Sequence, residues 1–253
     1  MSVAIIGRTP VANFMVTDAM AIAIDIEKVK SYRDCVLRDK IRKLYSSCVF
    51  YTLLGDEYLL WGIQYLDTWS HEMNVSIDFK KEETINQVLG ITEKIALMHN
   101  FTAKEERPFQ DTSTIYFIDK ESVIEYVIIK NDNKYSLFTR TEFTDYEVHI
   151  NYSGYKEKVQ FEAPEAPIDK YFDESIRIIN NFHQTRKVNP LLVGGKKLLL
   201  PYDFENRFCG ALIMPNEEVR SITPFKAISE LIASNYNNVW ELIDTPNLFY
   251  NPF

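Results

Sequence analysis

The hydrophobic pattern of this chain changes its period twice, and this constrains the fold more than any other feature. Before Gly55-Asp56, apolar and β-branched residues form short runs typical of strands, whereas beyond it they recur with the helical period of 3.6 residues. From Thr114 the strand pattern returns. A chain that supplies strands, then helices, then strands can bury both kinds of apolar surface in two stacked sheets with helices outside them.

The strand-like segments are short runs of apolar, β-branched and aromatic residues bounded by turn residues. The predicted strands are Ser2–Ile6, Val11–Thr17, Ile41–Tyr45, Cys48–Leu54, Ile115–Ile118, Val123–Lys130, Tyr135–Thr141, Tyr146–Tyr152, Leu191–Leu200 and Phe208–Met214. Ala19–Ile26 fits either a further strand or a short buried helix, because a continuous apolar run does not distinguish them. The charged segment Lys28–Lys43 is expected to be largely a solvated loop.

Helices are predicted where apolar residues recur three and four positions apart. The first begins after Gly55-Asp56 and carries apolar residues as far as Met73, and the others span Lys81–His99, Ile168–Gln184 and Phe225–Ile243. The first helix is apolar on two faces, with Leu59 and Ile63 on one and Tyr65 and Trp69 on the other. Such a helix is expected to be covered on both sides.

Length and charge restrict the class of protein. The 253 residues suffice for one large core, and no clear linker divides them, so one principal domain is expected. Lys and Arg total 28 against 36 Asp and Glu, which gives a net charge of −8. An acidic surface disfavours nucleic acid and anionic membranes as partners, because both require surplus positive charge.

Cysteine and histidine spacing excludes several kinds of site. Cys35, Cys48 and Cys209 are far apart and form no CxxC pair, so reduced thiols are expected rather than a disulfide framework or a zinc site. No HExxH motif occurs, and neither a metal nor a cofactor is expected. No apolar run approaches the ~20 residues that span a bilayer, and the N-terminal residues lack the basic start of a secretory signal. A cytoplasmic location is therefore expected.

Three segments of the first hundred residues carry a family resemblance: Ser2–Gly7, Val16–Asp18 and Lys40–Tyr45, followed by Gly55-Asp56 before a long helix. They resemble the proteasome β-subunit and the peptidase subunit of the bacterial HslUV protease, both N-terminal nucleophile (Ntn) hydrolases. The family places an Asp sixteen residues after the nucleophile, the separation of Ser2 and Asp18. Lys40 follows Asp18 by twenty-two residues, which implies a six-residue insertion relative to the family.

The resemblance implies specific roles for four residues. Ser2 would be the nucleophile after removal of Met1, and its own α-amino group would be the general base, with an ordinary pKa near ~7.7–8.0. Lys40 would favour the neutral amine and the alkoxide through its charge, and Asp18 would orient Lys40. Thr52 falls where the family has the glycine of the oxyanion hole.

The sequence departs from the family pattern at three places. Proteasome-type nucleophiles are nearly always Thr, whereas this chain has Ser2. Thr52 replaces a glycine, and its β-branched side chain restricts the backbone. The family's Asp-x-x-Ser-Gly element has no clear counterpart, because Ser153-Gly154 is preceded by Ile150 where the Asp should stand.

The resemblance implies an α+β fold, a four-layer αββα sandwich with two antiparallel sheets between helical layers. Residues 1–224 would form the Ntn-hydrolase-like domain, and residues 225–253 a helical extension packed on it or on a neighbouring subunit. The leading hypothesis is a proteasome-like peptidase or amidase, a threonine-peptidase-like hydrolase with Ser in place of Thr. It implies a polypeptide substrate, a homo-oligomeric ring and a possible ATPase partner. A catalytically inactive structural subunit of a ring and a small-molecule amidase using Ser2 remain open alternatives.

Overall fold

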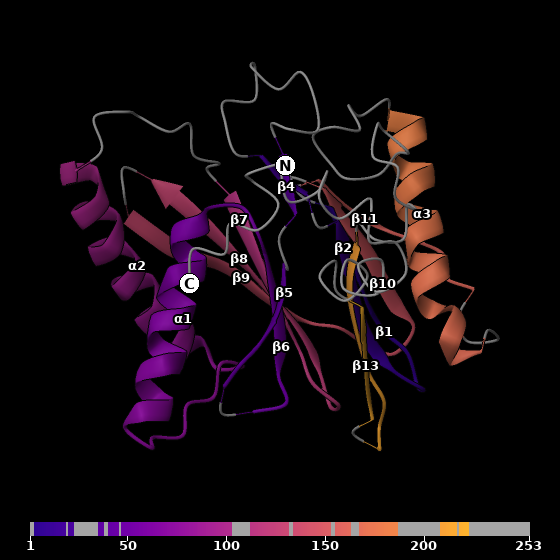
Figure 1. The fold of residues 1–253 in the computed structure, drawn as a ribbon, viewed down its shortest axis with the longest axis horizontal. Helices are drawn as coiled ribbons and strands as arrows, with labels where there is room; N and C mark the ends of the chain where they lie inside the picture. The colour runs from indigo at the N-terminus through magenta and orange to yellow at the C-terminus, as the bar shows by residue number, and fades with distance from the viewer. Residues whose placement is uncertain are drawn as a thin grey trace, which may run out of the picture.

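Two antiparallel sheets lie face to face in the computed structural model, with helices on both outer sides (Figure 1). The structure describes residues 3–18, 20–22, 35–37, 40–45, 47–102, 112–131, 134–152, 155–162, 167–186, 208–216 and 218–222. The layers follow the order helix, sheet, sheet, helix, which confirms the expected αββα sandwich.

The first sheet has six strands in the order β11-β10-β1-β2-β12-β13. Their bounds are β1 Val3–Arg8, β2 Asn13–Asp18, β10 Glu147–Tyr152, β11 Tyr155–Lys158, β12 Phe208–Ile213 and β13 Val219–Ile222. The centre of the sheet is formed by β1 and β2, which pair with Ala4 opposite Thr17. The N-terminal strand is thus enclosed by neighbours on both sides.

The second sheet has five strands in the order β5-β6-β7-β8-β9. Their bounds are β5 Ile41–Lys43, β6 Phe50–Leu54, β7 Thr112–Ile118, β8 Val123–Asn131 and β9 Lys134–Glu142. A separate two-stranded pair joins β3, Met20–Ile22, to β4, Cys35–Leu37. The ambiguous run Ala19–Ile26 therefore contains a strand, and the segment expected to be a loop contains β4.

Helices cover the outer face of each sheet. The helices α1, Glu57–Glu72, and α2, Glu82–Thr102, lie over the five-stranded sheet (Figure 1). On the opposite side, α3, Tyr171–Arg186, continues a short 3-10 helix, Ile168–Lys170, and lies over the six-stranded sheet. The first three predicted helices are confirmed with small shifts of their ends. The predicted strand Leu191–Leu200 and helix Phe225–Ile243 lie outside the described residues.

Three apolar clusters hold the four layers together. The cluster between the sheets draws on both of them, and its largest members include Met15, Tyr116 and Phe143. The second lies between the five-stranded sheet and helices α1 and α2, and the third between the six-stranded sheet and α3. The central strands β1 and β2 are covered on both faces, so all their residues except Arg8 are buried, whereas the edge strand β9 is largely exposed.

The expectation that α1 is covered on two sides is wrong for the part of the chain that the structure describes. Leu59 and Ile63 are fully buried, whereas Tyr65 is 59% exposed and Trp69 is 42% exposed. Periodicity shows that a face is apolar, but it does not show that another element packs against it. Two strands, β11 and β13, were also not predicted; β11 pairs with β10, with Tyr155 opposite Tyr152.

The switch from strand to helix is fixed at Gly55-Asp56. Gly55 has φ +138°, and a side chain there would collide with Ser113, so only glycine fits this turn. The Asp56 backbone N–H donates to Ser113 Oγ at 2.9 Å. Its carboxylate then caps α1 by accepting the N–H of Tyr58 at 3.0 Å.

The capping carboxylate of Asp56 also binds two side chains of the five-stranded sheet. Its Oδ2 accepts a hydrogen bond from Tyr135 Oη at 2.6 Å and an ion pair from Lys130 Nζ at 3.1 Å. Burial raises the pKa of Tyr135, and the Asp56 carboxylate raises it further, so the phenol remains a donor. One buried carboxylate therefore positions α1 against β8 and β9.

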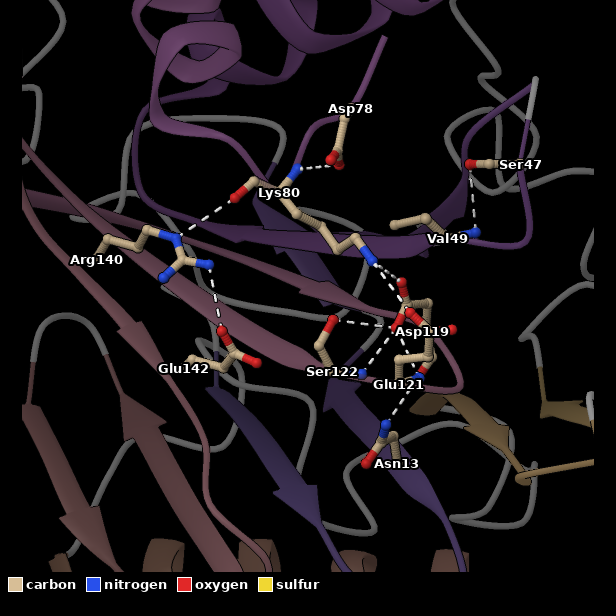
Figure 2. Close-up of polar contacts among 10 residues, drawn as sticks. All are labelled: Asn13, Ser47, Val49, Asp78, Lys80, Asp119, Glu121, Ser122, Arg140 and Glu142. Atoms are coloured by element: carbon tan, nitrogen blue, oxygen red, sulfur yellow. Dashed lines mark hydrogen bonds and ion pairs between the residues drawn. The ribbon is translucent and has the colours of Figure 1, made fainter. Parts of the chain in front are cut away.

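Polar contacts also join the two sheets at their edges. The β7–β8 turn is held by Asp119, whose Oδ1 accepts the N–H and hydroxyl of Ser122 and whose Oδ2 pairs with Lys80 Nζ at 2.7 Å (Figure 2). Asn13 Nδ2, at the start of β2, donates to the Asp119 carbonyl at 2.7 Å. This turn of one sheet is therefore tied to the first strand pair of the other.

A buried polar network joins the sheets at a second place. Tyr116 Oη on β7 donates to Glu125 Oε1 on β8 at 2.6 Å and accepts from Asn151 Nδ2 on β10 at 2.9 Å. Glu125 Oε2 pairs with Lys156 Nζ on β11 at 2.6 Å. The Glu125 charge is thus compensated across the interface between sheets, as a buried carboxylate requires.

Replacing Asp56 with Ala is expected to lower the free energy of unfolding by at least about 3 kcal/mol, because the change removes a helix cap and the anion of a buried ion pair. Urea denaturation followed by circular dichroism measures the loss. Asp78→Ala is the matched control, since Asp78 is exposed and its carboxylate accepts one hydrogen bond among the described contacts, from the Lys80 N–H at 3.0 Å. Equal losses in the two variants would contradict the role of Asp56 at the α1–sheet junction.

Asp119 is expected to make the stability depend on pH in acid. Burial would raise the pKa of Asp119, but hydrogen bonds from Lys80, Glu121 and Ser122 outweigh burial and lower it. A carboxyl with a lowered pKa stabilises the fold above its unfolded pKa of about 3.9, and this contribution is lost as pH falls through the folded pKa.

The free energy of unfolding of Asp119→Asn should therefore be below that of the parent at pH 7, with the difference shrinking progressively in more acid solution. Urea denaturation at a series of pH values tests this. Glu121→Gln is the control, because Glu121 is largely exposed and lies 3.9 Å from Lys80. A difference between Asp119→Asn and the parent that stays constant with pH would contradict the assignment.

Candidate functional site

Asp18 is the last residue of β2, and its side chain is fully buried. Because β2 runs antiparallel to β1, the end of β2 lies beside the beginning of β1. Asp18 Oδ1 accepts the backbone N–H of Val3 at 2.9 Å. The carboxylate therefore fixes the first described residue of β1, which directly follows Ser2 in the sequence.

Among the described contacts, Lys40 is the one charged side chain that binds Asp18. Its Nζ lies 2.8 Å from Asp18 Oδ2, and its side chain is 12% exposed. The backbone N–H of Lys40 donates to the Sγ of Cys209 on β12 at 3.4 Å. Lys40 thus reaches the ion pair from just before β5, while its main chain is held by the six-stranded sheet.

The partners of Asp18 explain how a charge is accommodated at this depth. Desolvating a carboxylate costs several kcal/mol unless a counter-charge and hydrogen bonds compensate it. Here one oxygen accepts an amide N–H and the other an ammonium group. The pair of Asp18 and Lys40 is therefore a mutually dependent unit, in which removing either member leaves the other in a buried environment.

Tyr152 on β10 is a further polar neighbour of this pair. Tyr152 lies opposite Val3 in the strand pairing. Burial raises the pKa of the Tyr152 phenol, and the negative charge of Asp18 raises it further. The phenol consequently stays neutral near pH 7 and keeps a proton that it can donate.

Thr52 lies within β6, between Ile41 on β5 and Tyr116 on β7. Its hydroxyl donates to the Lys40 carbonyl at 2.8 Å, and its side chain is buried. Thr52 therefore helps to hold the backbone of Lys40. Its role in an oxyanion hole stays a prediction.

The structure brings three of the four predicted site residues together. Asp18 contacts Lys40 directly, and Thr52 contacts Lys40 through the main chain. Ser2 lies outside the described residues, as does Ser153-Gly154. The pair nevertheless lies at the start of β1, one residue beyond Ser2 in the sequence.

Sequence reasoning did not identify the contributions of Cys209 and Tyr152. The cysteines were expected to be buried thiols, which is confirmed for Cys209 and wrong for Cys48, whose side chain is exposed. The contact of Cys209 with Lys40 spans 169 residues of sequence. Tyr152 reaches the site through the pairing of β10 with β1. Neither contact leaves a local signal, because strand register sets both of them.

Two buried polar atoms near the site have no hydrogen-bond partner among the described residues. They are Thr17 Oγ1 and Asn151 Oδ1. Both residues are paired with Ala4, one on each side of β1. An unsatisfied hydroxyl and an unsatisfied amide oxygen beside a small residue give the space between the sheets a polar lining close to Asp18.

The described residues contain no group of three or more His, Cys, Asp or Glu side chains arranged to hold a metal ion. Within the same part of the chain, no helix has the length and apolar character needed to cross a membrane. The described residues of the site supply an ammonium group from Lys40, a carboxylate from Asp18, a phenol from Tyr152 and the backbone amide of Val3.

Comparisons with known proteins give remote structural similarity only. No family model matches the chain, and no curated protein matches it in sequence. One similar solved structure is the Gly-1 mutant of Anbu from Hyphomicrobium sp. strain MC1, with 12% identity, a TM-score of 0.44, and 95% of this chain and 97% of that chain covered.

Two further structures are similar to a comparable degree. Anbu, described as an ancestral beta-subunit, from Yersinia bercovieri shows 10% identity and a TM-score of 0.43, with 96% of this chain and 95% of that chain covered. BPH from Thiobacillus denitrificans in complex with epoxomicin shows 10% identity and a TM-score of 0.45, with 85% and 98% covered. Identities of 10–12% carry no residue roles from these proteins to Asp18, Lys40 or Thr52.

Proposed function

We propose that this chain is a proteasome-like hydrolase subunit, a peptidase or amidase, with Ser2 as nucleophile once Met1 has been removed. The observation that carries the proposal is the buried pair of Asp18 and Lys40 beside the first residues of β1. This pair supports the proposal because Asp18 binds both the Lys40 ammonium group and the backbone N–H of Val3, the residue that follows Ser2 in the sequence, and a nearby cation activates a nucleophile.

In the proposed reaction, the α-amino group of Ser2 takes the proton from its own hydroxyl. The oxygen attacks a substrate carbonyl, an ester forms on Ser2, and the leaving amine receives the proton. Water then hydrolyses the ester, with the α-amino group again acting as base. The bond broken in the substrate is the amide C–N bond, and the products are a carboxylic acid and an amine.

Lys40 and Asp18 have distinct tasks in this proposal. The positive charge of Lys40 disfavours protonation of the nearby amine and stabilises negative charge on the Ser2 oxygen. Asp18 is a positioning residue, because it holds the Lys40 ammonium group at 2.8 Å and the Val3 amide at 2.9 Å. The residue that follows the nucleophile is thereby fixed relative to the cation.

A catalytically inactive structural subunit is the second candidate, and Thr52 favours it. Thr52, which the resemblance aligns with the oxyanion-hole glycine, is buried between two neighbouring strands and uses its hydroxyl to hold Lys40. A site that served only to stabilise the sandwich would need the same ion pair and no space for substrate. The two candidates therefore differ in what happens at Ser2 rather than in the fold.

Assembly belongs to the same proposal. By resemblance, copies of this chain would form a ring, with an ATPase as a possible partner and polypeptide as substrate. Residues 225–253 would pack as an extension on the domain or on a neighbouring subunit. Sedimentation velocity of the purified chain gives the size of such an assembly.

The intact mass of the protein purified from its native host should be lower than that of the full sequence by one methionine. Removing Met1 exposes the α-amino group that the mechanism uses as base. The processed protein should then gain the mass of a β-lactone inhibitor, whereas Ser2→Ala should not. Retention of Met1 would exclude the proposed base and favour the structural subunit.

Lys40→Met combined with Asp18→Asn is expected to keep the fold and to lower peptide hydrolysis at least about 100-fold, as expected for loss of an electrostatic group at the reaction centre. Lys40→Met alone should also lower the free energy of unfolding by about 3–5 kcal/mol, because Asp18 then loses its buried counter-charge. Turnover of a fluorogenic peptide and urea denaturation measure the two effects.

The matched control for this experiment is Lys43→Met, which removes an exposed lysine from the same strand, β5. It should change neither turnover nor stability. If the double variant hydrolyses peptide at the parental rate, Lys40 and Asp18 serve only the fold.

A further inference from the structure

Exposed apolar side chains gather on one helical layer of the sandwich, the layer of α1 and α2 (Figure 1). The described residues leave eleven large apolar side chains exposed, and none of the eleven lies on α3. Six of them lie on α1, on α2 or directly after α1; they are Tyr65, Trp69, Met73, Val75, Leu97 and Met98. In the described part of the chain, the exposed apolar surface is thus concentrated on one of the two outer layers, as at an interaction site.

Three of these side chains form a row on α1. Tyr65, Trp69 and Met73 follow one another at intervals of four residues, which places them on one face of the helix. They are 59%, 42% and 60% exposed. Aromatic and methionine side chains are enriched where proteins bury surface against a partner. These three residues, the exposed row of α1, therefore form a surface that another apolar element is expected to cover.

Residues 245–253 have the composition of a segment that suits such a row. They contain no Asp, Glu, Lys or Arg. Pro246 and Pro252 disfavour a helix, so an extended course is expected. The large apolar side chains of this segment gain free energy by leaving water; they are Leu248, Phe249, Tyr250 and Phe253. An uncharged aromatic segment and an exposed aromatic row thus have the same need for a partner.

The chain leaves the described fold at the edge that carries α1. The edge strand β13 lies next to β12, and β12 contacts β5 across the sandwich. In the five-stranded sheet, β5 is itself an edge strand, and its neighbour β6 leads directly into α1. Ile222, the last residue of β13, therefore starts the remaining chain at the same edge as β5, β6 and α1.

The length of the intervening chain suits the path from β13 to the outer surface of α1. That path crosses one spacing between sheets, about 10 Å, and one helix diameter, about 10–12 Å. The helix predicted over Phe225–Ile243 begins three residues after Ile222 and is about 28 Å long at 1.5 Å per residue. A helix of this length, lying with its apolar face on the edge formed by β5 and β13, brings the following residues to α1.

We propose that residues 225–253 cross the β5–β13 edge of their own domain and that residues 245–253 cover the exposed row of α1. The segment then supplies the second covered side that the apolar pattern of α1 predicts. This inference assigns the segment to its own domain rather than to a neighbouring subunit. It does not depend on the proposed hydrolase activity, because neither Ser2 nor the pair of Asp18 and Lys40 takes part in it.

Photo-crosslinking in the full chain tests the contact directly. The photoreactive residue p-benzoylphenylalanine in place of Tyr65 should capture residues 245–253, identified by peptide mass spectrometry, in a product with the mass of one chain. The same residue in place of Phe138, which is exposed on β9 at the opposite edge of the sheet, should not capture them.

Three results of this experiment would overturn the proposal. In the first, residues 245–253 are captured only in a product with the mass of two chains, so that a neighbouring copy supplies the segment. In the second, the captured peptide belongs to α1 or α2 of another copy, so that the exposed row is an interface between two copies. In the third, the position of Tyr65 captures nothing from residues 245–253.

Digestion with a glutamate-specific protease measures how firmly the segment is held, because cleavage after Glu241 requires its local release. Trp69→Ser and Phe249→Ser should each speed this cleavage at least tenfold, whereas Phe138→Ser should leave its rate unchanged. Cleavage after Glu125, which is buried in the interior strand β8, reports loss of the whole fold and should stay slow in every variant. Cleavage after Glu241 in Trp69→Ser at the parental rate overturns the proposal.

Discussion

The buried carboxylate of Asp18 is the constraint on which the centre of this molecule depends. It binds the Val3 amide of β1 and the Lys40 ammonium group, and Lys40 is in turn held by Cys209 of the six-stranded sheet and Thr52 of the five-stranded sheet. Residues of both sheets therefore hold this one ion pair in place. Because an uncompensated charge at this depth is so unfavourable, the relative position of the sheets and the geometry of the site are set together.

Local chemistry made part of this arrangement predictable. Gly55-Asp56 marks the start of α1 because a positive φ and a capping carboxylate leave few other residue types possible. Asp18 and Lys40 were singled out by the family resemblance, which for Lys40 required an insertion of six residues relative to the family. The contact of Lys40 with Cys209 was not predicted, since the register of β12 against β2 brings it about across 169 residues.

The same limit explains the error at α1. An amphipathic pattern reports which side chains avoid water on average, but coverage of a second face depends on elements that the pattern does not locate. Leu59 packs against the sheet, while Tyr65 and Trp69 remain exposed in the described part of the chain. Ser2 illustrates a different limit: its role depends on processing of the terminus, which neither spacing nor packing determines.

Thr17 and Asn151 lower the stability of the packing between the sheets. Each leaves a buried oxygen without a hydrogen bond in the described structure, directly beside Ala4, although the surrounding core is well packed. An apolar side chain of similar shape at Thr17, such as Val, would relieve a desolvation penalty of about 1–3 kcal/mol. At Asn151 the same change would also remove the hydrogen bond to Tyr116 Oη and so weaken the network between the sheets. Engineering for heat resistance would therefore start at Thr17, where a polar atom can be removed without breaking a described contact.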